Sequence, residues 1–117
     1  MAPINAPTAQ ELHHRVFFDE RPEVDDGYGN SEGGFQQRFE VWAAFRPRGG
    51  SEAVVAARLE GRNVLGVYVR SSSQTRQIQA DWRMRDKHTG EIYAVKIVDA
   101  VTDRNWVYLE AQTGVAA

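Results

Sequence analysis

Alternation of apolar and polar residues predicts that this chain is built mainly from β-strands. The stretch from about His14 to Glu20 is rich in strand-favouring residues and ends before Pro22. The clearest strand covers residues 37–45 and ends at Pro47, because a proline has no N–H to donate to a sheet. Its two faces carry Phe39, Val41, Ala43 and Phe45 on one side and Glu40, Trp42, Ala44 and Arg46 on the other.

Four later segments show the same alternation. Residues 64–71 place Val67 and Val69 opposite Tyr68 and Arg70, and residues 80–86 place Trp82 and Met84 opposite Asp81, Arg83 and Arg85. Residues 91–101 place Tyr93, Val95 and Ile97 opposite Ala94, Lys96 and Val98, and residues 105–112 place Trp106 and Tyr108 opposite Val107 and Leu109. The turn at residues 87–90 joins two of these segments as a hairpin. About six strands with short connections predict an all-β fold, a small antiparallel barrel or sandwich.

An insert after Pro47 breaks the strand pattern. Between Ser51 and Glu60 the apolar residues adopt helical spacing, Ser51 is a suitable N-cap, and Gly61 is a natural end. An isolated helix needs roughly 12–15 residues to be stable in water. This shorter one is therefore expected to need a surface to pack on, such as another subunit.

Composition fits one domain of 117 residues, with residues 1–10 as a flexible lead. The mean hydropathy is −0.52, and no apolar run approaches the roughly 18 residues of a membrane-spanning helix. Neither a membrane association nor a secretory signal is expected. Residues 22–34 contain four glycines together with acids and turn formers, which predicts a long exposed loop.

Charge is distributed unevenly along the chain. Residues 1–40 contain three Arg and eight Asp or Glu, whereas residues 41–117 contain eleven Lys or Arg and eight acids. Most of the cations are arginines, which favour forked pairing with carboxylates or phosphates. This bias suits an interface, although an arginine-rich coding bias explains it equally well.

Candidate chemistry is sparse. The chain has no cysteine, no glycine-rich phosphate loop and no HExxH or GxSxG motif, so an enzyme is not expected and no cofactor is assigned. His13 and His14 are adjacent, so in a strand they would point to opposite faces and would not share a metal easily. Asp25 and Asp26 fit a mobile acidic loop better than a cation site. No catalytic, cofactor-binding or metal-binding residue is therefore proposed.

Aromatic residues are spread through the predicted strands and allow two interpretations. Exposed rings could stack nucleic-acid bases beside Arg46, Arg70, Arg83 or Arg85, as in single-strand binders. The favoured interpretation is that the rings pack the core and the arginines lie at its rim. Trp42, Trp82, Tyr93, Trp106 and Tyr108 are the expected structural anchors, with Trp42 anchoring either the core or an interface.

The order of several segments is more specific than any one motif. These are ELHHRVFF (11–18), FEVWAAFRPRGGSE (39–52), AARLEG (56–61), VYVR (67–70), DWRMRD (81–86), GEIYAVKIVD (90–99) and WVYLEA (106–111). Together they resemble the head-closure, or head-tail joining, family of tailed bacteriophages and phage-derived particles. The most specific element is VWA at 41–43 followed by Pro47, Gly50 and Glu52.

The resemblance implies a structural virion protein that forms a ring of six or twelve copies beneath the portal and its adaptor. Such a ring retains the packaged DNA and provides the surface on which tail terminator or tail tube proteins dock. The protein would occupy the host cytoplasm during assembly and the head-tail connector afterwards. The resemblance also implies that the insert from Pro47 to Arg62 is the variable segment of the family. Expected interface or channel residues are Arg46, Pro47, Arg48, Gly50, Glu52, Val55, Arg58, Leu59 and Arg62.

Three functions remain open at the level of sequence. The head-closure ring is favoured. A tail-completion or tail-terminator ring and an independent nucleic-acid-binding barrel are the alternatives.

Overall fold

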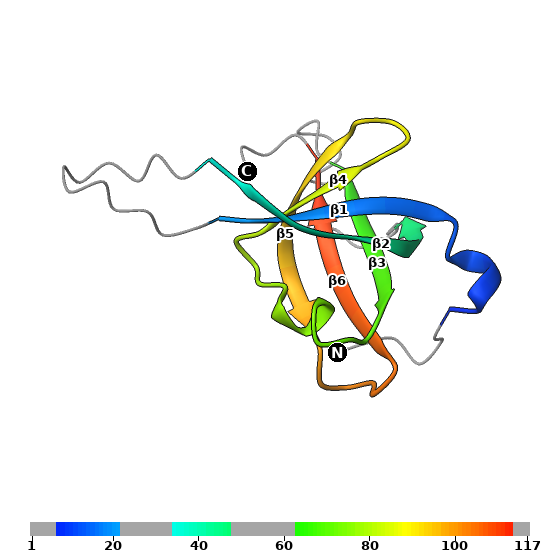
Figure 1. Cartoon of the computed structure of the whole chain (residues 1–117). Helices are drawn as coiled ribbons and strands as arrows, with labels where there is room; N and C mark the ends of the chain where they lie inside the picture. Colours follow the sequence, from blue (N-terminus) through cyan, green and yellow to red (C-terminus); the bar gives the residue numbers. More distant parts are fainter. Residues whose placement is uncertain (1–6, 22–33, 48–62, 114–117) are drawn as a thin grey trace.

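Six strands form a closed antiparallel barrel in the part of the chain that the structure describes (Figure 1). The structure is a computed structural model and describes residues 7–21, 34–47 and 63–113. The strands are β1 (His14–Glu20), β2 (Gln36–Pro47), β3 (Val64–Arg70), β4 (Arg83–Asp86), β5 (Ile92–Asp99) and β6 (Trp106–Gln112). Their order around the barrel is β1-β2-β3-β6-β5-β4, and β4 pairs with β1 to close it. The predicted all-β fold is confirmed, in its barrel form. The predicted helix at 51–60 lies outside the described residues.

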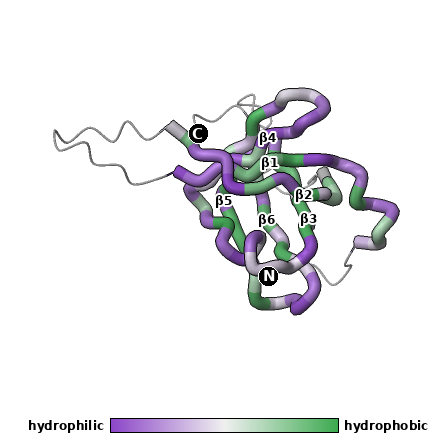
Figure 2. The backbone as a smooth tube through the Cα atoms, viewed as in Figure 1, coloured by the Kyte–Doolittle hydropathy of each residue, from purple (hydrophilic) through white to green (hydrophobic). Residues whose placement is uncertain are grey.

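The barrel interior contains one face of each strand, as the alternation predicts. Figure 2 shows apolar and polar stretches interleaved along the strands. The core comprises Val16, Phe18, Phe39, Ala43, Leu65, Val67, Val69, Ile78, Trp82, Met84, Val95, Val107, Leu109 and Ala111. Phe18, Phe39 and Trp82 form a continuous aromatic row, with ring centroids 5.6 and 6.0 Å apart. His14 stacks on Phe45 at 4.0 Å beside this core.

A second apolar cluster lies on the outside of the wall formed by β2, β3 and β6. It consists of Ala44, Tyr68, Trp106 and Tyr108, with Leu12 packed against them. Gly66 permits this packing, because a Cβ there would lie 3.2 Å from the Tyr108 hydroxyl and 3.1 Å from the Arg46 carbonyl oxygen. The short 3-10 turn η1 (Ala9–Glu11) precedes Leu12, and Pro7 is buried. Within the expected lead, Pro7 is buried, whereas Thr8, Ala9 and Gln10 are exposed.

The alternation predicted for β5 is wrong in its second half. Ile97 was assigned to the same face as Val95, yet it is 50% exposed, and Val98 packs against the core instead. The ladder with β6 shifts register between Val95 and Ile97, which is a β-bulge. A bulge adds one residue to a strand and so exchanges the faces of the residues that follow it.

The predicted hairpin at residues 87–90 is confirmed as the β4–β5 connection. Asp86 is buried, and its carboxylate accepts hydrogen bonds from the backbone N–H groups of His88 and Thr89. Gly90 has φ +77°, a conformation that a residue with a Cβ rarely adopts. The tight turn thus depends on an aspartate at its start and a glycine at its end.

Residues 71–82 cross one end of the barrel and include the 3-10 turn η2 (Thr75–Gln77). The buried Thr75 hydroxyl donates to the Arg70 carbonyl over 2.7 Å and accepts from the Ser72 N–H over 2.8 Å. These bonds hold the polar connection in place while Ile78 enters the core. No helix among the described residues is long and apolar enough to span a membrane.

Candidate interaction surface

The outer face of β1 and β2 presents an exposed tryptophan beneath an arginine. Arg15 and Trp42 are directly paired in the β1–β2 ladder and point outward, opposite to the core residues on either side of them. The Trp42 side chain is 51% exposed, and the Arg15 guanidinium carbon lies 4.9 Å from the centre of its ring. A cation at this distance is attracted by the aromatic face. The pair forms a preorganised, partly apolar prominence on the barrel wall.

Glu40 joins this pair to the neighbouring turn. Its Oε2 accepts from Arg15 Nε at 2.7 Å and from Lys87 Nζ at 3.1 Å. Hydrogen bonds from Arg15 and then from Lys87 lower the pKa of the Glu40 carboxyl below its ordinary value. Glu40 therefore remains charged and bound to both cations. Its bond to Arg15 holds the Arg15 side chain over the Trp42 ring.

Two grooves flank Trp42, and both are bordered by Arg15, Glu40 and Trp42. One has a volume of about 500 Å³ and continues to Leu12, Arg70 and Thr75. The other has a volume of about 740 Å³ and continues to the β4–β5 turn at Lys87, His88 and Thr89. His13 and His14 also border it. A side chain from a partner could enter on either side of the indole.

The adjacent histidines differ from their predicted arrangement. The expectation that they point to opposite faces is wrong, because β1 begins at His14 and His13 lies outside the strand. Their ring centroids are 4.4 Å apart. Burial, followed by the charge of His13, lowers the pKa of His14, while Asp86 opposes this effect.

A buried carboxylate fastens the seam between β1 and β4. Asp19 is 1% exposed and receives Arg83 Nε at 2.8 Å, Arg85 Nε at 2.6 Å and Arg85 Nη2 at 2.9 Å. The hydrogen bonds that Arg85 donates to the Asp19 carboxylate are the main cause that raises the pKa of Arg85. The Arg85 guanidinium carbon also lies 4.7 Å from the Phe17 ring centre. This seam has four paired positions, from Val16 to Asp19 on β1, so these charged bonds supplement a short ladder.

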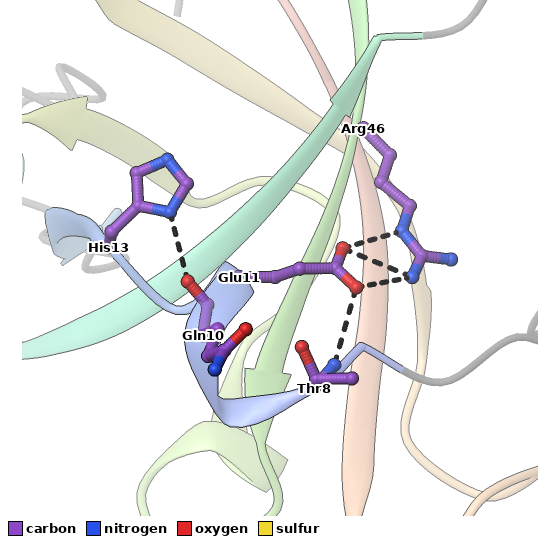
Figure 3. A network of polar contacts seen from close by, with 5 residues as sticks. All are labelled: Thr8, Gln10, Glu11, His13 and Arg46. Atoms are coloured by element: carbon purple, nitrogen blue, oxygen red, sulfur yellow. Dashed lines mark hydrogen bonds and ion pairs between the residues drawn. The ribbon is translucent and has the colours of Figure 1, made fainter.

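Arg46 has an internal partner. Its Nε and Nη2 approach the Glu11 carboxylate at 3.1–3.2 Å in a forked arrangement, and Figure 3 shows the contact. Glu11 Oε1 also accepts from the Thr8 backbone N–H at 3.3 Å, and the Arg46 guanidinium carbon lies 5.1 Å from the Tyr68 ring centre. Arg46 therefore fastens the N-terminal turn over the outer aromatic cluster, and a partner that uses Arg46 would have to compete with Glu11.

Most of the other expected interface residues belong to the insert after Pro47. Pro47 is the last residue of β2. The remainder, Arg48, Gly50, Glu52, Val55, Arg58, Leu59 and Arg62, lie outside the described residues, as does the loop at 22–33.

The expected anchors divide into two groups. Trp82, Trp106 and Tyr108 are buried, and Tyr93 packs against the core. Burial raises the pKa of the Tyr93 hydroxyl, with smaller contributions from Glu91 and Asp86. Trp42 is half exposed and does not anchor the core, so its interface role stays a prediction. Two of the candidate arginines lie over buried rings, Arg46 over Tyr68 and Arg70 over Trp106, each at 5.1 Å from the ring centre.

Sequence reasoning missed Arg15, Glu40 and Lys87 as members of this surface, and it missed the buried Asp19 at the β1–β4 seam. Only Asp19 had a signal in the sequence. Its carboxylate directly follows the apolar residues of β1, where a buried charge requires a partner. The partners could not be named, because the β1–β4 pairing joins residues more than sixty positions apart.

Comparison with known proteins gives the surface its context. A family model described as phage head completion protein matches residues 7–114 of the chain. The chain belongs to the phage head completion protein family. It is therefore a structural protein of the phage head. The family resemblance predicted from the sequence is confirmed.

Two solved structures share the fold of this family member. One comes from the virion of a native gene transfer agent particle, at 21% identity and a TM-score of 0.61, covering 91% of this chain and 97% of that chain. The other is the solution structure of protein SF1141 from Shigella flexneri 2a, at 15% identity and a TM-score of 0.64, covering 95% and 100% respectively. Among curated proteins, none matches the chain significantly in sequence. These likenesses show that the two solved structures have the same fold as this chain.

Proposed function

We propose that the protein forms a homo-oligomeric ring at the head-tail junction, beneath the portal and its adaptor. In this position the ring closes the DNA channel and presents a docking surface to tail proteins. Family membership supports a head protein of a phage or phage-derived particle, and the virion origin of one structural neighbour is consistent with that setting. The proposed ring contains six or twelve copies.

The observation that carries the proposal is the surface formed by Arg15, Glu40, Trp42 and Lys87 with the two grooves beside the indole, named here the Trp42 surface. A large aromatic side chain that is half exposed on a barrel wall leaves apolar area in water, and protein interfaces are enriched in tryptophan and arginine. Arg15 and Glu40 hold the indole in one orientation, which reduces the ordering cost of binding. A protein partner is the natural ligand of such a surface.

A free-standing nucleic-acid-binding barrel is less well supported. Base stacking requires accessible rings, yet Tyr68, Trp82, Trp106 and Tyr108 are all buried. Trp42 is exposed but has Arg15 at its face. We predict that the isolated protein binds DNA negligibly at physiological salt. Fluorescence anisotropy with labelled duplex and single-stranded DNA measures this directly, and micromolar, salt-sensitive binding would favour the alternative function.

Genetic removal tests the proposal. Particles assembled without this protein should package DNA but lose it, and they should lack attached tails. Supplying the wild-type chain should restore both properties. The control is Val101→Ser, which alters a 90% exposed residue far from Trp42 in the sequence and should complement fully. Particles that keep DNA and tails in the absence of the protein would exclude a closing role.

A further inference from the structure

The Trp42 surface has the chemistry of a site for an acidic peptide segment. Glu40 is shared between Arg15 and Lys87, so two cations face one carboxylate on one side of the indole. Arg70 borders the groove on the other side. The Asp86 carboxylate in the second groove is directed to the backbone N–H groups of its own turn. The surroundings of Trp42 are therefore apolar at the centre and cationic at the edge.

One segment of the chain has the complementary composition. Residues 22–33 contain four carboxylates, Glu23, Asp25, Asp26 and Glu32, and neither lysine nor arginine. Val24 and Tyr28 supply apolar and aromatic side chains between them. Opposite charges on the segment and on the surface speed their association and fix the orientation of the bound segment. An apolar side chain packed on the indole contributes affinity.

We propose that residues 22–33 of one copy bind the Trp42 surface of a neighbouring copy. The segment is connected to Glu20 at the end of β1 and to Gln36 at the start of β2, and these residues are paired. Arg15 and Trp42 are paired at the other end of the same ladder. With a rise of about 3.3 Å per residue, the two ends are separated by about 17 Å.

This separation makes the contact head-to-tail. Each copy donates a segment at one end of the β1–β2 ladder and accepts a segment at the other, so donor and acceptor are different surfaces. Repeated heterologous contacts generate a closed ring when the rotation between copies closes. The inference rests on the proposed ring and names the surfaces that would hold it together.

Cysteine crosslinking within assembled particles tests the contact, because the native chain has no cysteine. Thr89→Cys places a thiol on an exposed residue beside the second groove. It is combined in turn with Asp25→Cys, Asp26→Cys or Tyr28→Cys, and the particles are treated with a flexible bismaleimide. We expect a ladder of covalent multimers from the double variants and only monomer from each single variant.

The matched control replaces the acceptor position by Val101→Cys, which is 90% exposed but lies in the β5–β6 loop. Combined with the same donor cysteines, it should give no ladder. Adding Trp42→Ala to the crosslinking pair should lower the multimer yield by about tenfold or more, as expected for loss of an interface hot spot. Circular dichroism of this variant should be unchanged, because Trp42 is not part of the core.

The outcomes separate this contact from the ring itself. Crosslinks confined to single chains would mean that each segment covers its own Trp42. Crosslinks to a different particle protein would assign Trp42 to that partner. Particles that contain the protein in a ring but give no ladder with any of the three donors would overturn this contact and leave the ring standing. Absence of the protein from particles would instead remove the proposed function.

Discussion

Substitution of Asp19 is the strongest test of what holds the barrel closed. Asp19 is 1% exposed and accepts three charge-assisted hydrogen bonds of 2.6–2.9 Å from Arg83 and Arg85 across the β1–β4 seam. Removing one member of a buried ion pair costs about 3–5 kcal/mol because it leaves the partner charge uncompensated. Here the Arg83 and Arg85 side chains are 24% and 31% exposed, so water can replace part of the loss. We therefore expect Asp19→Ala to lower the free energy of unfolding by about 2–3 kcal/mol.

Urea unfolding followed by far-ultraviolet circular dichroism measures this change. The control is Glu20→Ala, which removes the partner of Arg38 from a pair whose side chains are 33% and 40% exposed. Exposed pairs contribute about 0–1 kcal/mol, so the control should remain near wild type. If Asp19→Ala lowers the free energy of unfolding no more than Glu20→Ala does, the bonds from Arg83 and Arg85 to Asp19 do not stabilise the seam, and the reasoning is refuted.

Three other experiments test particular contacts. A double-mutant cycle on Glu11→Gln and Arg46→Ala should give a coupling energy of about 0.5–1 kcal/mol by urea unfolding, because the two side chains are 39% and 32% exposed; a value of zero would contradict the fastening role of Arg46. Val98→Ala should cost about 1–2 kcal/mol and Ile97→Ala less than about 0.5 kcal/mol, although the latter removes more carbon atoms; the reverse order would place the β5 bulge elsewhere. The folded pKa of His14 is lowered, so the unfolded chain takes up its proton first as pH falls below the ordinary 6.5. Stability should be complete above that pH and should decline below it, and the decline should be smaller in His14→Gln; an NMR titration of His14 with a midpoint above 6.5 would contradict the sign.

The sequence predicts the strands well where local alternation is also the final arrangement. β1 has the predicted bounds, and β3 and β6 agree within one residue at either end, because each is a short run rich in β-branched and aromatic residues. The prediction fails at Ile97, where a bulge changes the period without any change in residue type. It also leaves the barrel order open, since the β3–β6 and β1–β4 ladders join distant segments through packing rather than local pattern.

The sequence predicted which strand residues of the interaction surface face outward, but it did not predict their contacts with one another. Alternation correctly assigned Trp42 and Glu40 to the face opposite the core. The partners Arg15 and Lys87 depend on the register of β1 against β2 and on the position of the β4–β5 turn. Register in a sheet is set by cooperative packing of whole faces, so these contacts become visible once the barrel is closed.

Localisation of the protein in the particle tests the central claim most directly. Electron cryo-microscopy of purified particles, compared with particles in which the chain carries a small C-terminal tag domain, would locate each copy. The account predicts a closed ring of barrels at the head-tail junction, on the channel axis beneath the portal and adaptor, with extra density from the tag around it. Tag density distributed over the capsid shell, located along the tail, or missing from the particles would contradict it.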